Sequence, residues 1–239
     1  IRGGWGRCGW VARKQGESER DLSVARRIHE RLFPAPGDYR GVEVAFAYEP
    51  MRQIGGDYLH CHADADGGVL IVVIDVTGHG IGSALAVNRL HGEIKRSIAQ
   101  GRTDPARLLR ALNEYIGDSL ADETVFATAL AVRIAPDRGS IAWCNAGHPP
   151  AMLVRAGGRV ERLETTAMML GATAWEEESA SEVLPWCAGD GLVIYTDGVV
   201  ESVDGRGGQF GIDGVERVLS AAGAGDPGAM VEALHAAVR

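Results

Sequence analysis

The order of the elements that the sequence predicts favours an α+β layered sandwich over a doubly wound parallel sheet. Apolar alternation and turn residues predict strands, then a pair of helices, then further strands, and helices again at the end. Because strands and helices do not alternate one for one, βαβ units are not expected. The 239 residues are 46% hydrophobic, which is enough for one sizeable core, and we expect a single domain.

The helices are predicted from apolar stripes and from the residues that begin or end them. Apolar residues recur at three- and four-residue steps in 18–33, and two prolines then end that helix. Gly101 ends the second helix, and Asp104, followed by proline, is a good N-cap for the third. The predicted helices are 18–33, 81–100, about 105–121, 212–222 and 227–238.

The strands are predicted as short alternating or apolar runs bounded by glycine-rich turns. The turn at residues 66–68 joins two of them into a hairpin, and the next segment is punctuated by turns at 137–139, 147–150 and 157–158. The predicted strands are 42–50, 58–64, 70–75, 126–134, 141–145, 151–155, 160–163 and 192–197.

Composition excludes several classes of function. The formal net charge is -8 and no cluster of Lys and Arg is visible, which argues against a nucleic-acid-binding surface. No apolar stretch approaches the roughly 18 residues of a membrane span, and the start lacks a signal-peptide pattern. The four cysteines are scattered and form no Cys-x-x-Cys pair, so we expect reduced thiols and a cytoplasmic domain.

We expect three parts along the chain. Residues 1–17 are rich in Gly and Arg and are interpreted as a linker or the tail of a preceding domain. Residues 18–36 are interpreted as a signalling or linker helix, with a helix packed on its own domain as the alternative. Residues 37–239 form the main domain. The chain does not begin with Met and ends within a predicted helix, so we expect both ends to be cut from a longer chain.

Three acidic residues stand next to predicted strands. Asp57 lies in a glycine-rich turn, and Asp75 and Asp197 end the two most apolar runs. An acid at the end of a buried strand must be hydrated, paired or bound to a cation. Each could instead cap a turn through its own side chain, which is common for Asp before Gly. Three acids in matching contexts without an evident basic partner favour a site for a hard metal ion.

Other motifs fail at particular positions. A dinucleotide-binding fingerprint that begins after Asp75 has Ser83 where its third glycine is needed. A calcium loop that begins at His62 has Val73 where a glutamate is needed, so a hairpin is the better interpretation. No cysteine is followed six residues later by Arg, and no Gly-x-Ser-x-Gly elbow is present. His148 lies in a Gly/Pro turn, where a structural hydrogen bond is as good an interpretation as acid–base catalysis.

Six short strings follow one another in the chain: ARRIHERLFP at 25–34, IGGDY at 54–58, IDVTGHG at 74–80, NAGHPP at 145–150, GDGLVIYTDGVVE at 189–201 and FG at 210–211. Each string alone is weak evidence. Together and in this order they resemble the PPM-type (PP2C-like) metal-dependent serine/threonine protein phosphatases, in particular the bacterial sporulation and stress-response branch. The resemblance extends from about residue 18 to the end of the chain.

The resemblance implies an αββα four-layer sandwich, in which two mainly antiparallel sheets are flanked by pairs of helices. It implies hydrolysis of phosphoserine or phosphothreonine by a water that bridges two Mn²⁺ or Mg²⁺ ions. Asp75 matches the carboxylate that bridges both metals, and Val76 matches the residue that lends its backbone carbonyl. Asp57 matches the acid on the side of the second metal, and Asp197 matches a ligand of the first. Arg52, five residues before Asp57, is interpreted as an exposed arginine, with a role in holding the phosphate as the alternative.

The resemblance also implies partners. The substrate would be a regulatory phosphoprotein such as an anti-sigma-factor antagonist. An N-terminal sensor domain would act through the 18–33 helix, which is also the candidate surface for a homodimer. The alternative is a non-catalytic signalling or interaction module with the same fold, against which the intact acids at positions 57, 75 and 197 argue.

Two features depart from the family pattern. The family often has an acid three residues after the Asp57 position, where this chain has His60; with His62, we interpret it as a surface group or a support of the site. The family's last metal-ligating Asp follows the C-terminal helix, within which this chain stops at Arg239. Asp204, Asp213 and Asp226 fall too early to replace it. We therefore expect a truncated domain that binds one metal weakly and is poorly active.

Overall fold

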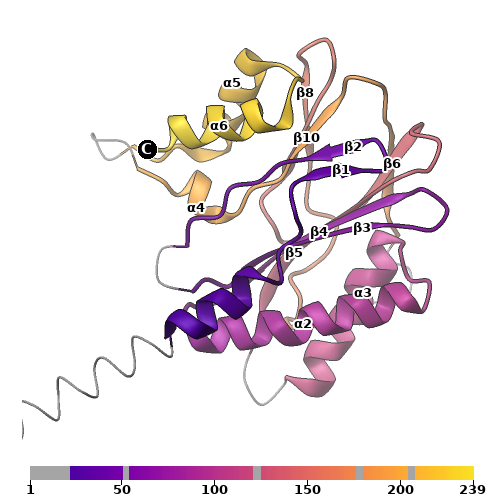
Figure 1. Ribbon diagram of the computed structural model, residues 1–239, viewed down its shortest axis with the longest axis vertical. Coiled ribbons are helices and arrows are strands. Elements are labelled where there is room, and N and C mark those ends of the chain that lie inside the picture. The colour runs from indigo at the N-terminus through magenta and orange to yellow at the C-terminus, as the bar shows by residue number, and fades with distance from the viewer. Residues whose placement is uncertain (1–21, 51–53, 121–124, 176–179, 204–207) are drawn as a thin grey trace, which may run out of the picture.

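Two β-sheets stack between two pairs of helices (Figure 1). The structure is a computed structural model, and it describes residues 22–50, 54–120, 125–175, 180–203 and 208–239. The α+β class and the four-layer arrangement predicted from the sequence are confirmed. The predicted linker at residues 1–17 lies outside the described residues.

The larger sheet has the strand order β3-β4-β5-β6-β9, and every neighbouring pair is antiparallel. Its strands are β3 (Asp57–Ala63), β4 (Val69–Val76), β5 (Ala127–Ile134), β6 (Ser140–Ala146) and β9 (Glu182–Pro185). Helices α2 (Ile81–Ala99) and α3 (Pro105–Ser119) cover one face of this sheet (Figure 1). Asp104 caps α3 by accepting a hydrogen bond from the Arg107 backbone at 3.0 Å, as its position before a proline predicts.

The smaller sheet has the order β10-β7-β8 and is also antiparallel. Its strands are β7 (Ala151–Val154), β8 (Val160–Leu163) and β10 (Gly191–Val193). Helices α5 (Gly211–Ala222) and α6 (Pro227–Ala237) cover its outer face.

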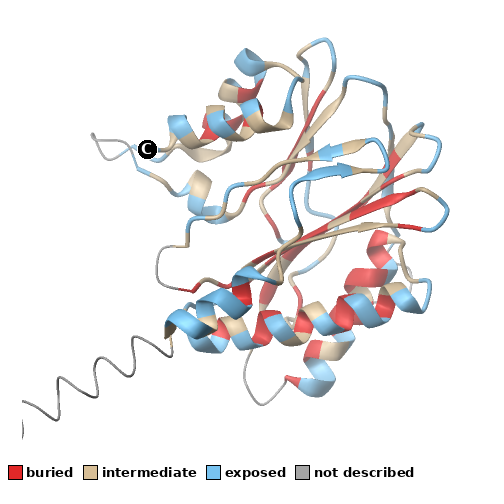
Figure 2. Ribbon diagram, viewed as in Figure 1, coloured by how far each residue is buried: buried red, intermediate tan, exposed pale blue. Residues whose placement is uncertain are grey.

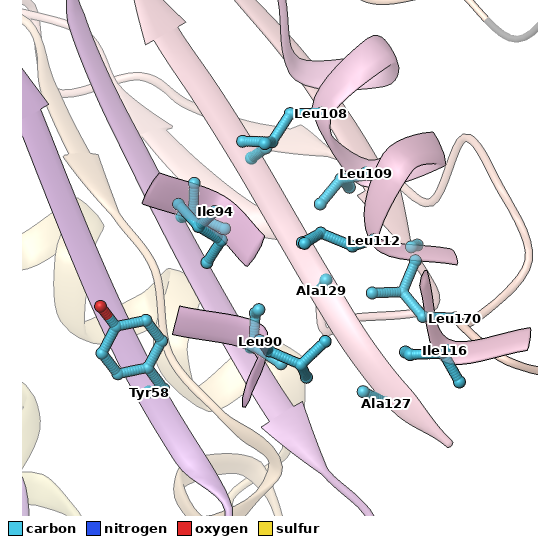
Figure 3. Packing of buried hydrophobic residues seen from close by; sticks show 14 of the residues in the cluster. Tyr58, Leu90, Ile94, Leu108, Leu109, Leu112, Ile116, Ala127, Ala129 and Leu170 are labelled. Atoms are coloured by element: carbon cyan, nitrogen blue, oxygen red, sulfur yellow. The ribbon is translucent and has the colours of Figure 1, made fainter. Parts of the chain in front are cut away.

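Three apolar clusters fill the spaces between the four layers. The first joins α2 and α3 to the larger sheet (Figure 3). The second lies between the two sheets, and the third lies between the smaller sheet and its helices. Figure 2 shows the buried residues on the strands and on the inner sides of α2 and α3. Leu32 and Phe33, which follow the helix at 22–30, pack against the first cluster.

Several predicted elements differ in the structure. The strand predicted at 42–50 is only β2 (Val42–Val44), which pairs with β1 (Gly37–Tyr39), a strand that was not predicted. Strand β9 was also missed, because three of its four residues are exposed and it carries little apolar signal. The helix predicted at 18–33 is helical at 22–30 and ends in turn residues, and residues 18–21 lie outside the described part.

The apolar run at 192–197 was predicted as a buried strand, and this prediction is wrong in its second half. The strand β10 ends at Val193, and Asp197 is the first residue of a short helix, α4 (Asp197–Val200). An apolar run has no periodicity that separates strand from helix, so the change of direction before Asp197 could not be read from it. None of the helices in the described residues is both long enough and apolar enough to cross a membrane.

Candidate metal centre

Asp57 and Asp75 lie directly opposite each other on neighbouring antiparallel strands. Asp57 is the first residue of β3 and pairs with Asp75 near the end of β4. Opposed residues of an antiparallel pair project from the same face with their Cβ atoms about 4.5–5.5 Å apart. Ile74 and Val76 belong to the apolar cluster that faces the helices. Side chains alternate along a strand, so Asp75 between them points into the space between the sheets. The two acids therefore meet at one end of the gap between the sheets.

Asp197 approaches this pair from the other sheet. It follows β10 after three residues and is exposed at the start of α4. The side chain of the preceding residue, Thr196, lies close enough to the Asp57 carboxylate to lower its pKa, which places the two segments next to each other. Residues 140 positions apart in the chain are thereby brought to one place.

The electrostatics show that the acids act on one another. The pKa of Asp75 is raised to about 7, first by burial and then by the negative charges of Asp57, Asp197 and Glu201. The pKa of Asp57 is raised by burial and by Asp197, while the Thr196 side chain opposes that rise. Three carboxylates and Glu201 are therefore close enough to repel one another.

The two residues that follow Asp75 are held by backbone hydrogen bonds to the segments before β3 and β5. The Val76 N–H donates to the Gly56 carbonyl at 3.1 Å, and the Thr77 N–H donates to the Phe126 carbonyl at 2.9 Å. A Cβ on Gly56 would lie 2.3 Å from the carbonyl oxygen of Val76, so only glycine fits there. Gly78 and Gly80 both have φ of 90°, and this turn leads into α2.

The charges at the site fit a divalent cation. In the described part of the chain, no Lys, Arg or His side chain forms an ion pair with Asp57, Asp75 or Asp197. Clustered carboxylates that lack a cationic partner are the oxygen donors that Mg²⁺ and Mn²⁺ prefer. No group of three or more His, Cys, Asp or Glu side chains among the described residues is already arranged to hold an ion, however.

The N-terminal helix also reaches the site. His29 is 3% exposed, packs against Phe33 with the ring centroids 5.6 Å apart, and lies against the Asp57 backbone. The Tyr48 hydroxyl accepts a hydrogen bond from the Gly55 N–H at 3.2 Å, two residues before Asp57. This segment is therefore packed on its own domain, one of the two interpretations that the sequence left open.

The structure thus brings together the three acids that the sequence singled out, with Val76 beside them. Sequence reasoning gave no role to Thr196 and Glu201, although Glu201 stands four residues after Asp197, one helical turn away. Arg52 lies outside the described residues. His79 is exposed in the turn before α2.

His60 is half-buried and is not a surface group. It faces the helices, away from Asp57, and its Nδ1 lies 2.9 Å from the Tyr58 hydroxyl. Asp57 and His60 lie three residues apart on β3, and an odd spacing along a strand places side chains on opposite faces. His62 makes a 3.5 Å contact with Asp64. Strands β3 and β4 pair antiparallel on either side of this turn, so the hairpin interpretation is confirmed, and Asp64 and Asp66 in the turn both bind Arg133.

The fold is that of PP2C-type phosphatase domains. The SiaA-PP2C domain of Pseudomonas aeruginosa matches with a TM-score of 0.82 at 22% identity, over 94% of this chain and 90% of that one. The PP2C phosphatase domain of SpoIIE from Bacillus subtilis matches with a TM-score of 0.67 at 18% identity, over 81% of this chain and 56% of that one. At these identities the likeness concerns the fold.

The family follows from the sequence match. The model of the family described as Stage II sporulation protein E (SpoIIE) matches residues 65–239, and the chain belongs to this family. The phosphoserine phosphatase RsbP of Bacillus subtilis is 28% identical over 187 residues, which is 77% of this chain and 46% of that protein. The chain therefore spans about half the length of that curated relative. The predicted membership of the sporulation and stress-response branch is confirmed.

Proposed function

We propose that this chain is a metal-dependent protein serine/threonine phosphatase domain. The observation that carries the proposal is the convergence of Asp57, Asp75 and Asp197 at one end of the gap between the sheets, with their charges uncompensated by a described cation. Membership of the SpoIIE family and the PP2C fold support the same function.

Asp57, Asp75, Asp197 and the Val76 carbonyl would hold Mn²⁺ or Mg²⁺, and two ions are the number that the family resemblance implies. When bound, such ions supply Lewis acidity toward the phosphoryl group and a water activated near neutral pH. The carboxylates of the chain remain charged in that state, since a nearby cation favours the ionised form. The Thr196 side chain beside Asp57 also favours the ionised form of that carboxylate, because it lowers its pKa.

The finer parts of the proposal come from the resemblance. The substrate is a regulatory phosphoprotein, with an anti-sigma-factor antagonist as the favoured kind. A sensor domain that precedes the chain and a homodimer formed through residues 18–33 are the proposed partners, and the cytoplasm is the proposed location. The similarity of this chain to the phosphoserine phosphatase RsbP and to the structure of the RsbU and RsbW domains of Rv1364c from Mycobacterium tuberculosis supports this setting.

The test compares the chain with its Asp75→Asn and Asp197→Asn variants. Mn²⁺ binding is measured by calorimetry, and phosphate release from a phosphoserine peptide is measured with and without Mn²⁺. Binding is the primary readout, because the resemblance places one further acidic ligand beyond Arg239. We expect both variants to lose Mn²⁺ binding by at least about 10-fold and any Mn²⁺-dependent turnover by about 100-fold or more.

Asp66→Asn is the matched control. Asp66 is an exposed acid paired with Arg133, and it lies in the β3–β4 turn, at the end of these strands opposite to Asp57 and Asp75. The Asp66→Asn variant should bind Mn²⁺ as the unchanged chain does. If the unchanged chain binds no Mn²⁺ or Mg²⁺, the non-catalytic interaction module with the same fold replaces the phosphatase.

A further inference from the structure

A row of side chains continues from the two acids onto the next strand. Asp57 pairs with Asp75, and Asp75 pairs in turn with Thr128 on β5. Directly opposed residues share a face of the sheet, so the Thr128 side chain projects into the same end of the gap between the sheets. A threonine hydroxyl therefore borders the candidate metal centre on the side away from Asp57.

The Thr128 hydroxyl is held by a buried histidine. The Oγ1 atom of Thr128 lies 2.9 Å from Nδ1 of His148, in the turn between β6 and β7. The turn is itself fixed, because the His148 N–H donates to Oδ1 of Asn145 at 2.8 Å and Gly147 has a φ of 68°. His148 is 2% exposed, so its ring is locked in one place.

The other side of His148 faces the segment that carries Asp197. The backbone of Tyr195 lies against the imidazole ring, and Nε2 of the ring has no hydrogen-bond partner in the described structure. Tyr195 is followed by Thr196, whose side chain lies near Asp57, and then by Asp197. A continuous series of contacts thus links Asp57 and Asp75 to Thr128, Thr128 to His148, and His148 to residues 195–197, which lie beside Asp57.

The chemistry of His148 does not suit an acid–base catalyst. Burial lowers the pKa of its imidazole to about 4, so the ring is neutral near neutral pH. The ring is also shielded from solvent and lies behind Thr128 rather than beside the carboxylates. A neutral, immobile imidazole that bridges two segments is suited to setting their spacing.

We propose that His148 is a positioning residue of the metal centre, which holds β5 beside Asp75 and the 195–197 segment at the separation that lets Asp75 and Asp197 share a cation. Partners behind metal ligands orient those ligands, and their loss typically lowers metal affinity 10- to 100-fold. The inference rests on the proposed function, since it presupposes that these acids bind a metal ion.

The experiment measures Mn²⁺ affinity by calorimetry and thermal unfolding in EDTA for two pairs of variants. His148→Leu removes the polar atom at the Nδ1 position, and His148→Asn restores one there. Thr128→Val removes the hydroxyl with little change of shape, and Thr128→Ser keeps it. We expect the Leu and Val variants to bind Mn²⁺ about 10- to 100-fold more weakly, and the Asn and Ser variants to bind within about threefold of the unchanged chain.

The double variant His148→Leu/Thr128→Val should bind no more weakly than either single variant, because both remove one contact. Ser181→Ala is the matched control: its hydroxyl bridges Ala106 and Asp104 at 3.0 Å each, away from the acids. It should lower the melting temperature and leave the Mn²⁺ affinity unchanged.

Unchanged Mn²⁺ affinity in folded His148→Leu overturns the inference and leaves the proposed function intact. Absence of Mn²⁺ binding by the unchanged chain overturns both. If His148→Leu does not fold in EDTA, the near-isosteric Thr128→Val decides, and unchanged affinity in that variant overturns the inference.

Discussion

Asp75 shows how one side chain can oppose folding and still be kept for binding. It is half-buried, it faces Asp57 across the strand pair, and the negative charges of Asp197 and Glu201 act on it as well. Each of these surroundings disfavours the ionised carboxylate. The site is thus destabilised in the absence of a cation, as expected where function is selected over stability.

The substitution Asp75→Asn should stabilise the metal-free protein, and more so at high pH. The folded-state pKa is raised from 3.8 to about 7, so the contribution of this group to stability is lost as the pH rises through 7. Asparagine stays neutral throughout. In EDTA we expect a gain of about 1–2 kcal/mol at pH 8, allowing for solvent screening, and a smaller gain at pH 5.

Urea unfolding at the two pH values measures this difference. Asp66→Asn is the control of opposite sign, because hydrogen bonds and Arg133 lower the pKa of Asp66. It should not gain stability at pH 8. Equal stability of the Asp75→Asn variant and the unchanged chain at pH 8 would contradict the charge repulsion described above.

Gly56 is required by a close approach of two backbones rather than by a turn. Because an added Cβ would lie 2.3 Å from the Val76 carbonyl, Gly56→Ala must move β3 away from the end of β4. We expect a loss of about 2–3 kcal/mol and weaker Mn²⁺ binding. Gly92→Ala on the exposed side of α2 meets no atom within 4 Å and should gain about 0.5–1 kcal/mol. Thermal unfolding and calorimetry compare the two, and equal stabilities would exclude the steric account.

Tyr58 joins three elements behind the metal centre. Its hydroxyl lies 2.9 Å from Nδ1 of His60 on β3, 2.5 Å from Nδ1 of His91 on α2, and 3.5 Å from the Leu32 carbonyl after the N-terminal helix. One hydroxyl has a single proton to donate, so at least one of the imidazoles must donate to it. The network connects the helix at 22–30 with the strand that begins at Asp57.

The substitution Tyr58→Phe should separate these elements at a cost to stability. It leaves two partly buried ring nitrogens without their partner, and we expect a loss of about 1–3 kcal/mol. The control is Tyr39→Phe, since the Tyr39 hydroxyl donates to the Ala35 carbonyl at 2.8 Å in an exposed setting and should cost under about 1 kcal/mol. Chemical denaturation measures both, and a Tyr58→Phe variant no less stable than the Tyr39→Phe variant would contradict the network.

The layered fold assembles the candidate site from distant parts of the chain. The larger sheet supplies Asp57 and Asp75, and the segment after the smaller sheet supplies Asp197. Both are held by apolar clusters that lie between the layers and not at the site. Metal binding should therefore stabilise the whole molecule, because the ligands come together only when both sheets are folded.

Mn²⁺ at about 100 times its dissociation constant should add about 2.7 kcal/mol, or roughly 5–10 °C in melting temperature. The gain should shrink as the pH falls. Burial lowers the pKa of His29, His60, His91 and His148, so stability from these groups is lost as the pH falls below 6.5. In the metal-free protein, the raised pKa values of Asp57 and Asp75 offset this loss, because their repulsion disappears when they are protonated. Bound Mn²⁺ favours their ionised forms, so the offset is absent in the metal-bound protein. Melting curves from pH 5 to 8 with Mn²⁺ and with EDTA check whether the pH dependence is steeper with Mn²⁺.

Prediction of the elements succeeded where one local signal dominates. The strand Val160–Leu163 was predicted at its observed bounds, and the helix predicted at 81–100 is α2. Prediction failed at 42–50 and 192–197, where an apolar pattern continues past the point at which strand pairing stops. Pairing depends on a partner elsewhere in the chain, so the residues of a strand do not by themselves determine where the strand ends.

The acids themselves could be recognised from the chain, because a carboxylate beside an apolar run is a local feature with a known energetic cost. The α+β class could be recognised as well, from the order of the elements. Only the folded molecule decides that Thr196 reaches Asp57, that Glu201 acts on Asp75, and that His60 faces the helices instead of the metal centre. Those relations depend on sheet register and on the packing of layers, which bring together residues that share no sequence pattern.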